Sequence, residues 1–268
     1  MNSWRSSVFI EMYSASVVTA PGDSPVNENT FLQGFHDLRD GHVLITPEQA
    51  SRFAKEVAGD FNPIHDPDSR RFCVPGDLLF ALVLARYGVS ASMRCRFVGM
   101  VGEGVPLVFP ENPGSRFMIS DTQGRNYLEV EREGPVVTDP YTIEALTRSY
   151  VAFSGQNFPH VLVPLMEKHA VMVNPARPLV IYERMSLEVL TPVGSLTETV
   201  EATLGGAEMK VDGKRGDVRL DYALCVEGEP FATGSKHLVL SGLRPYDAAV
   251  MSDMVAEYAG WKDAYRAA

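Results

Sequence analysis

The chain has 268 residues, of which 34 are acidic and 24 are basic, and its net charge is −10. This acidic balance argues against a nucleic-acid partner, because such proteins need a basic surface. No apolar stretch is long enough to span a bilayer, so no membrane-embedded part is expected. With 45% hydrophobic and 22% charged residues, the chain is typical of a globular protein with a substantial core.

Three cysteines are present, Cys73, Cys95 and Cys225. They show no CxxC spacing, and their odd number argues against a disulfide framework. The first apolar run is short and is interrupted by Glu11, so it is not a convincing signal peptide. We therefore expect a reducing, cytoplasmic environment. The sequence also lacks a dinucleotide fingerprint, a P-loop and a cysteine–histidine cluster, so we expect neither a cofactor nor a bound metal.

Residues 1–40 lack clean periodicity and are interpreted as a partly ordered N-terminal extension. A helix is predicted next, because Thr46 suits an N-cap, Pro47 the first helical position and Gln49 the reciprocal place in a capping box. Gly59 is placed to end this helix. Apolar residues recur at helical spacing between these ends, at Ala50, Phe53, Ala54 and Val57.

The stretch AGDFNPIHDPD begins where this helix is predicted to end. It brings an acid, an amide and an imidazole together in Asp60, Asn62 and His65, and Pro63 stiffens the chain between them. A carboxylate beside an imidazole can act as base and acid near neutral pH. Two interpretations stay open at this point: a catalytic loop, or Asx turns that only close the helix.

The next predicted helix opens at Pro75 and Gly76 and closes at Gly88. Residues 78–85 are apolar on every side, and a helix with no polar face must be enclosed by other structure. Short segments rich in β-branched and aromatic residues follow, at 92–101, 105–110, 115–121 and 125–134. This order predicts an α+β fold in which a curved antiparallel sheet wraps an apolar helix.

The same order of elements is then repeated. Asp139 and Pro140 suit a second helix start, the stretch SGQNFPH closes that helix, and residues 161–173 are a second apolar helix candidate with Pro164 near its start. Further strand candidates follow at 178–190, 196–211, 217–228 and 230–243. We therefore expect one unit at 41–138, a second, degenerate unit at 139–243, and a C-terminal helix at 244–268.

The expected C-terminal helix carries an apolar stripe of Met251, Met254, Val255 and Tyr258. Such a stripe predicts a helix packed on the body of the protein. A helix that binds a partner protein is the alternative.

The stretches FAKEVAGDFNPIHDPD and VPGDLLFAL resemble the hydratase motif of the MaoC-like, R-specific enoyl-CoA hydratases, which have the hot-dog fold. The match runs from Ile45 to Gly88, and its most specific part is G-D-x-N-P-x-H. The whole chain also resembles an uncharacterised bacterial family of hot-dog proteins that carries this motif. Together with the repeat, the resemblance implies a double hot-dog fold, with two apolar helices each wrapped by curved antiparallel sheet.

Carried over to this sequence, the resemblance implies that Asp60 and His65 activate a water that adds to C3 of a 2-enoyl thioester, while Asn62 helps to orient them. The backbone N–H at Gly76 is then expected to meet the thioester oxygen, because a helix N-terminus offers unpaired donors and the positive end of a dipole. The implied partner is an acyl thioester of coenzyme A or of an acyl carrier protein.

The sequence also departs from the hydratase pattern. Pro75 stands where these hydratases have histidine, and the segment before Gly76 is shorter, so their acyl specificity does not carry over. Asp77 sets a negative charge beside the expected oxyanion site, where it can cap the helix or weaken enolate stabilisation. Gln156 takes the place of the motif's aspartate in the second unit, so no second active site is expected there.

Three functions stay open from the sequence. The first is hydration or dehydration of a 2-enoyl-CoA, the second is thioester hydrolysis, and the third is non-catalytic binding of acyl-CoA in regulation. Arg70 and Arg71 are weaker candidates for contacts with coenzyme A phosphates, against the alternative of a solvated charge pair. A homodimer also stays open, although two units in one chain can already supply the usual hot-dog pair.

Overall fold

The computed structural model describes residues 30–191 and 199–267, so the expectation for residues 1–29 lies outside the described residues. Helical and strand structure begins within the predicted N-terminal extension of residues 1–40. A short 3-10 turn, η1 (Thr30–Leu32), and the strand β1 (Asp37–Arg39) precede β2 (His42–Leu44). Three side chains of this segment are part of the core: Phe31, Leu32 and Phe35. Their spacing follows no regular apolar period, so the sequence did not predict that the segment is ordered.

The first predicted helix forms, and its caps are the predicted ones. Thr46 Oγ1 accepts from Gln49 N–H (3.2 Å) and Gln49 Oε1 accepts from Thr46 N–H (2.9 Å), so the capping box is complete. The helix runs as α1 (Pro47–Arg52) and continues as a wider π-helical turn, η2 (Phe53–Ala58). Gly59 ends it at φ 65°, a left-handed conformation that glycine adopts without strain.

Helix α2 (Gly76–Tyr87) is enclosed on all sides, as its apolar sequence predicts. Residues 78–84 are each at most 5% exposed. A curved antiparallel sheet wraps this helix in the order β1-β2-β4-β5-β6-β3. The strands that follow the helix in sequence are β3 (Val89–Phe97), β4 (Leu107–Val108), β5 (Arg116–Asp121) and β6 (Asn126–Val137).

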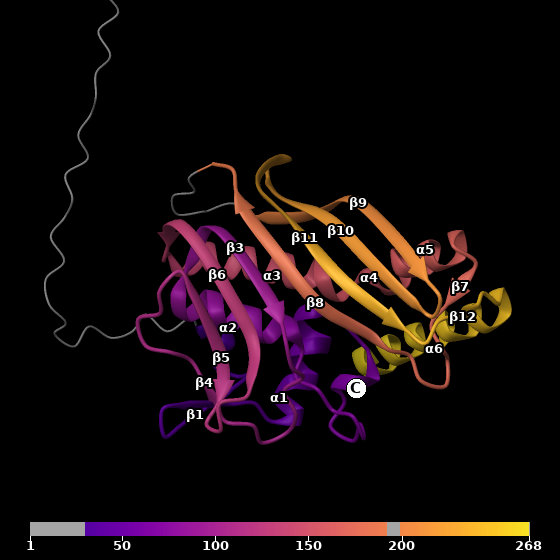
Figure 1. The fold of residues 1–268 in the computed structure, drawn as a ribbon, viewed down its shortest axis with the longest axis horizontal. Helices are drawn as coiled ribbons and strands as arrows, with labels where there is room; N and C mark the ends of the chain where they lie inside the picture. Colours follow the sequence, from indigo (N-terminus) through magenta and orange to yellow (C-terminus); the bar gives the residue numbers. More distant parts are fainter. Residues whose placement is uncertain (1–29, 192–198, 268) are drawn as a thin grey trace, which may run out of the picture.

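The second half of the sheet repeats this order. Its strands run β8-β11-β10-β9, as β3-β6-β5-β4 run in the first half. Strands β3 and β8 pair antiparallel, with Met93 opposite Leu187, so β1 to β6 and β8 to β11 form one continuous sheet (Figure 1). The bounds are β8 (Val180–Val189), β9 (Val200–Asp212), β10 (Arg215–Val226) and β11 (Glu229–Ser241).

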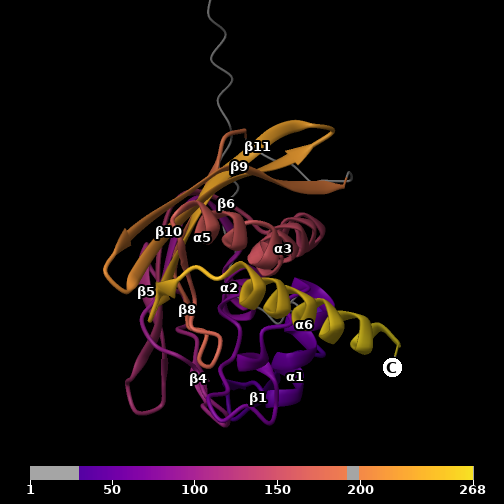
Figure 2. The same ribbon diagram turned by 90° about the vertical axis from the view of Figure 1, so that its right-hand side faces the viewer.

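Helices α2, α3 and α6 lie on one side of the sheet (Figure 2). Helix α3 (Pro140–Gly155) begins at the predicted cap, since Asp139 Oδ2 accepts from Thr142 N–H (2.8 Å), and it packs against α2, β9 and β10. The α+β class and the double hot-dog arrangement predicted from the sequence are therefore present. The repeated strand order supports a division into two units near residue 139, which stays a prediction.

The second apolar helix is shorter than predicted. Residues 157–173 form α4 (Asn157–His160) and α5 (Leu162–Lys168), and the chain then enters β7 (Val171–Met172). The predicted helix stops early because β7 pairs with a distant strand, β12 (Arg244–Pro245), and this partner leaves no mark on the local pattern.

The C-terminal helix α6 (Ala248–Ala267) packs on the body of the protein, as its apolar stripe predicts. Met251 and Tyr258 are buried along it. The Tyr258 hydroxyl accepts a hydrogen bond from Phe61 N–H (3.0 Å), and the two rings meet edge to face. A helix from the end of the chain therefore holds the turn that follows η2.

The ends of η2 and α3 approach each other at their backbones. A Cβ placed on Gly155 would lie 2.3 Å from the carbonyl oxygen of Ala58 and 2.8 Å from its Cβ. No side chain fits at such distances, so a residue other than glycine would push the two helix ends apart.

Gly155→Ala should lower the free energy of unfolding by about 1–3 kcal/mol, because overpacking against a backbone carbonyl outweighs the roughly 1 kcal/mol by which alanine favours a helix. Gly102→Ala is the control, since a Cβ at Gly102 would meet nothing within 4 Å. The control should change stability by less than about 0.5 kcal/mol. Urea denaturation followed by circular dichroism measures both, and equal stabilities would show that the helix ends are not so close.

Candidate active site

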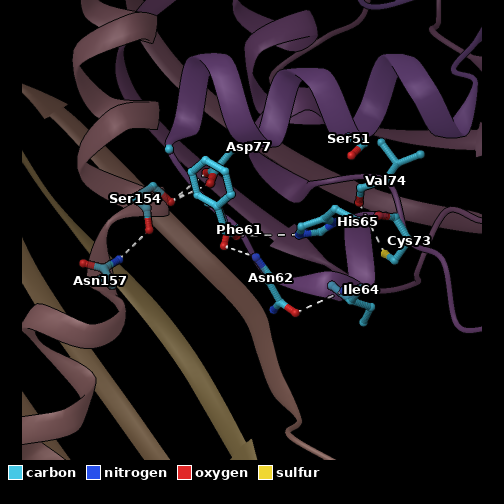
Figure 3. A network of polar contacts seen from close by, with 12 residues as sticks. Ser51, Phe61, Asn62, Ile64, His65, Cys73, Val74, Asp77, Ser154 and Asn157 are labelled. Carbon is cyan, nitrogen blue, oxygen red and sulfur yellow. Dashed lines mark hydrogen bonds and ion pairs between the residues drawn. The ribbon is translucent and has the colours of Figure 1, made fainter. Parts of the chain in front are cut away.

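The turn after η2 is built from two Asx turns. Asp60 Oδ1 accepts from Asn62 N–H (2.9 Å). Asn62 Oδ1 accepts from Ile64 N–H (3.2 Å) (Figure 3). Asn62 thereby caps the 3-10 turn η3 (Pro63–His65). The Asx turns expected in one of the two interpretations are therefore present, and the part that Asn62 plays in catalysis stays a prediction. The second oxygen of Asp60 takes no part in the turn.

That second oxygen faces His65. Asp60 Oδ2 lies 3.7 Å from His65 Nε2, which is beyond hydrogen-bond distance and leaves room for a water bonded to both groups. His65 Nδ1 lies 2.6 Å from the carbonyl oxygen of Cys73 (Figure 3). A carbonyl only accepts, so Nδ1 carries a proton. In the neutral ring Nε2 is then free to accept one.

The N-terminus of α2 lies beside this pair. The helix starts with hydrogen bonds from Leu78 and Leu79 N–H to the carbonyl oxygen of Pro75 (3.1 and 3.4 Å). By helix geometry the N–H of Gly76 has no intrahelical acceptor, so it is a donor for a ligand. A Cβ on Gly76 would lie 3.0 Å from Phe97 and 3.2 Å from Tyr182, so a side chain there would crowd the helix end.

One cavity of about 320 Å³ brings these groups together. Asp60, Asn62, His65 and Gly76 all line it, so the structure places the four candidate catalytic residues around a single space. The walls are mostly apolar and come from both halves of the sheet and from α6. They include Phe97, Val101, Leu162, Val180, Leu238 and Met254.

A second polar cluster lies in the same wall. Ser154 Oγ donates to the carboxylate of Asp77 (2.7 and 2.8 Å), and Lys236 Nζ donates to Ser154 O (3.0 Å) and to Ser154 Oγ. Asn157 Nδ2 also donates to Ser154 O (2.7 Å), so Ser154 lies between Asp77 and Asn157 (Figure 3). Asp77, Ser154 and Lys236 are all buried and all line the cavity.

Burial and the partner's charge have opposite effects on the pKa of each titratable group in this cluster. Burial raises the pKa of Asp77, although the charge of Lys236 and the hydrogen bond from Ser154 pull it down. Burial lowers the pKa of Lys236, while the charges of Asp77 and Asp60 raise it. Surroundings of low dielectric constant disfavour both charged forms, so each group stays charged only with the help of the other. Lys236 therefore favours the charged form of the carboxyl group at the start of α2, and Asp77 favours the charged form of Lys236.

Lys236 and Ser154 were not predicted from the sequence. A signal for Lys236 existed, because it alternates with Leu238 and Leu240 on one face of β11, and a lysine on a buried face needs a compensating charge. No local signal exists for Ser154, because it meets Asp77 across 77 positions of sequence.

The remaining candidates lie apart from the cavity. Arg70 and Arg71 are exposed, and neither is part of the cavity wall, so the structure does not bring them to Asp60 and His65. Gln156 is exposed beside Gly59, with its Cγ 3.5 Å from a Cβ placed on that glycine.

Two further features concern metals and membranes. Within residues 30–191 and 199–267, no three His, Cys, Asp or Glu side chains are grouped so as to hold a metal ion. The absence of a metal or cofactor in function stays a prediction. In the same part of the chain, no helix has both the length and the apolar character needed to cross a membrane.

Residues 30–249 match the family described as "Protein of unknown function (DUF3581)". The chain belongs to this family. No curated protein matches it.

Three solved structures that resemble this chain are each at most 12% identical to it. A putative oleoyl thioesterase from Lactobacillus plantarum is 10% identical, with a TM-score of 0.39, over 65% of this chain and 91% of that one. A MaoC-like dehydratase is 11% identical, with a TM-score of 0.38, over 76% and 97%. The peroxisomal multifunctional enzyme type 2 from Drosophila melanogaster is 12% identical, with a TM-score of 0.38, over 72% and 47%. At these scores the likenesses identify no reaction.

Cys73 offers a direct test of how enclosed the cavity wall is. Burial raises the pKa of its thiol from 9.0 to about 11. Because the thiolate is the reactive form, iodoacetamide at pH 8 should alkylate Cys73 in the folded protein about 100-fold more slowly than in the urea-unfolded chain. The rate should continue to rise about tenfold per pH unit up to pH 10. Residue-resolved mass spectrometry measures it, and a folded rate within tenfold of the unfolded one would contradict the burial.

Proposed function

We propose that this protein is an acyl-thioester enzyme that adds water across the double bond of a 2-enoyl-CoA, or removes it in the reverse direction. The observation that carries the proposal is the placement of Asp60 Oδ2 and His65 Nε2, 3.7 Å apart in the wall of a largely apolar cavity. A water between them is held by an acceptor on each side, and the start of α2 supplies a donor in the same space.

The chemistry follows from the protonation state of His65. Nδ1 donates to Cys73 O, so Nε2 accepts a proton from the water as its oxygen bonds to C3 of the enoyl group. The electrons of the C2–C3 double bond move onto the thioester oxygen and form an enolate. Asp60 orients the water and stabilises the imidazolium. The proton on Nε2 then passes to C2, and the carbonyl is restored in a 3-hydroxyacyl thioester.

The thioester oxygen becomes negative during this step, and we assign the N–H of Gly76 to it. A donor fixed at a helix N-terminus stabilises that charge without reorganising, and the apolar walls strengthen the interaction because they exclude water. The same walls suit an acyl chain. Arg70 and Arg71 stay predicted contacts for the phosphates of coenzyme A outside the cavity.

Thioester hydrolysis is the second candidate, because the water held by Asp60 and His65 can attack the carbonyl carbon instead of C3. A single assay on crotonyl-CoA separates the outcomes. Loss of the enoyl absorbance without free thiol is hydration, and release of thiol is hydrolysis. Binding without either change is the behaviour of a non-catalytic acyl-CoA binding protein.

Asp60→Asn and His65→Ala should each lower kcat for crotonyl-CoA by at least roughly 10²-fold, the scale expected on losing a positioned acid or base. The two losses should not add in free energy in the double variant, because both residues act on one water. Steady-state absorbance kinetics measures the effect.

The matched controls are Asp68→Asn and His160→Ala, whose side chains are exposed outside the cavity wall. Both should retain wild-type kcat, and all variants should keep the wild-type circular dichroism spectrum. Near-full activity of Asp60→Asn and His65→Ala would show that the motif is only structural.

Gly76→Ala should raise KM for crotonyl-CoA by about tenfold, because the new methyl group meets Phe97 and Tyr182 at 3.0–3.2 Å and narrows the approach to the helix end. The comparison is Gly102→Ala, which meets nothing within 4 Å. An unchanged KM in the Gly76 variant would show that the start of α2 is not part of the binding site.

A further inference from the structure

The cluster of Asp77, Ser154 and Lys236 has no part in the mechanism above, although it lines the same cavity. Lys236 is 5% exposed, and a lysine is rarely buried to that degree without a partner. Ser154 supplies both acceptors that its Nζ reaches in the described part of the chain. An ammonium group has three donors, so one N–H has no oxygen or nitrogen acceptor among the described residues and faces only the ring of Tyr182, a weak partner that a ligand oxygen can replace.

Lys236 lies close to the start of α2 through two independent contacts. Its Nζ is 4.3 Å from the centre of the Tyr182 ring, and the edge of that same ring is 3.2 Å from a Cβ placed on Gly76. Its Nζ also shares Ser154 Oγ with Asp77, the residue next to Gly76. The lysine therefore reaches the part of the cavity where the helix N–H is free.

The charges near the start of α2 also favour a position beside Lys236 for a substrate oxygen. Asp77 and Asp60 both face this end of the cavity, and two carboxylates there oppose the formation of a third negative charge on a substrate oxygen. Lys236 is the cation that couples to both of them. A substrate oxygen that becomes negative during the reaction is therefore stabilised more strongly when it lies beside this cation.

We propose that Lys236 donates a hydrogen bond to the carbonyl oxygen of the bound acyl thioester and, with the N–H of Gly76, forms its oxyanion site. Ser154 and Asp77 are positioning residues that hold the ammonium group. The proposal rests on the proposed function for its ligand class, a thioester. Its alternative is a purely structural polar cluster, in which Ser154 connects Asp77 of α2 to Lys236 of β11.

The first measurement reads the carbonyl directly. Butyryl-CoA labelled with ¹³C at the thioester carbon cannot be hydrated, and isotope-edited infrared spectroscopy reports how strongly its carbonyl is polarised. Binding to the wild type should shift the carbonyl stretch to lower frequency. Lys236→Met should lose this shift, Lys236→Arg should retain part of it, and the exposed control Lys210→Met should retain all of it.

The second measurement compares two ligands by calorimetry. Lys236→Met should lower the affinity for butyryl-CoA by about 10-fold or more, as expected on losing a hydrogen bond to a charged group. It should change the affinity for S-butyl-CoA, a thioether without the carbonyl, by less than about twofold. If the role of Lys236 is only structural, the substitution should lower the affinity for both ligands equally or for neither.

Removing Lys236 alone leaves Asp77 as an unpaired buried carboxylate, so this variant can unfold. The double variant Asp77→Asn/Lys236→Met removes both charges and keeps the volume close to the original. It should remain folded, lack the infrared shift and retain the affinity for S-butyl-CoA. A folded double variant with an unchanged shift would overturn the proposal.

The two proposals fail separately. A wild type that shifts the carbonyl but never hydrates crotonyl-CoA would refute the proposed function and support the role of Lys236. A wild type that hydrates crotonyl-CoA, with a shift unaffected by the Lys236 variants, would do the reverse. A wild type that binds neither butyryl-CoA nor S-butyl-CoA would refute both.

Discussion

The backbone of Gly155 lies so close to the backbone of Ala58 that no side chain fits between the two helix ends. Each of these residues adjoins a turn with polar groups, since Asp60 follows η2 and Ser154 is part of the last turn of α3. Their contact therefore fixes the separation between the polar groups of the first half of the molecule and those of the second. A cavity lined from both halves depends on this approach, because α2 alone supplies only one of its walls.

Charged and apolar side chains are unevenly distributed around the cavity. Asp60, His65, Asp77 and Lys236 lie near the start of α2, while the walls from α5, α6 and the second half of the sheet are largely apolar. Burying Asp77 and Lys236 costs free energy that an apolar pair would not, so their stabilising effect on the fold is small at best.

The C-terminal helix completes the site from the far end of the chain. Tyr258 bonds to the N–H of Phe61 across 197 positions and packs its ring on Phe61, Phe158 and Trp261. Burial raises the pKa of Tyr258, so the hydroxyl stays neutral and serves as a hydrogen-bond partner for the turn. The geometry of Asp60 thus depends on a helix that the motif itself does not include.

Interactions between residues a few positions apart could be predicted from the sequence. The capping box of Thr46 and Gln49, the stop at Gly59 and the enclosed helix at 78–84 each follow from local hydrogen bonding or from the apolar pattern. The grouping of Asp60 with His65 belongs to the same class, because a single short turn carries both. The extended strand β7 escaped prediction because its partner β12 lies far along the chain.

Only the tertiary structure placed Ser154 and Lys236 beside Asp77. These residues come from α3, β11 and α2, and no spacing in the sequence relates them. The sequence by itself determined the helices at 47–58, 76–87 and 140–155, the long strands of the sheet and the turn that carries the acid and the imidazole, because short-range hydrogen bonds and apolar periodicity decide those features. The shape of the cavity and its buried cation were decided by packing between the two halves, because contacts across many tens of residues depend on how the sheet and helices fit together.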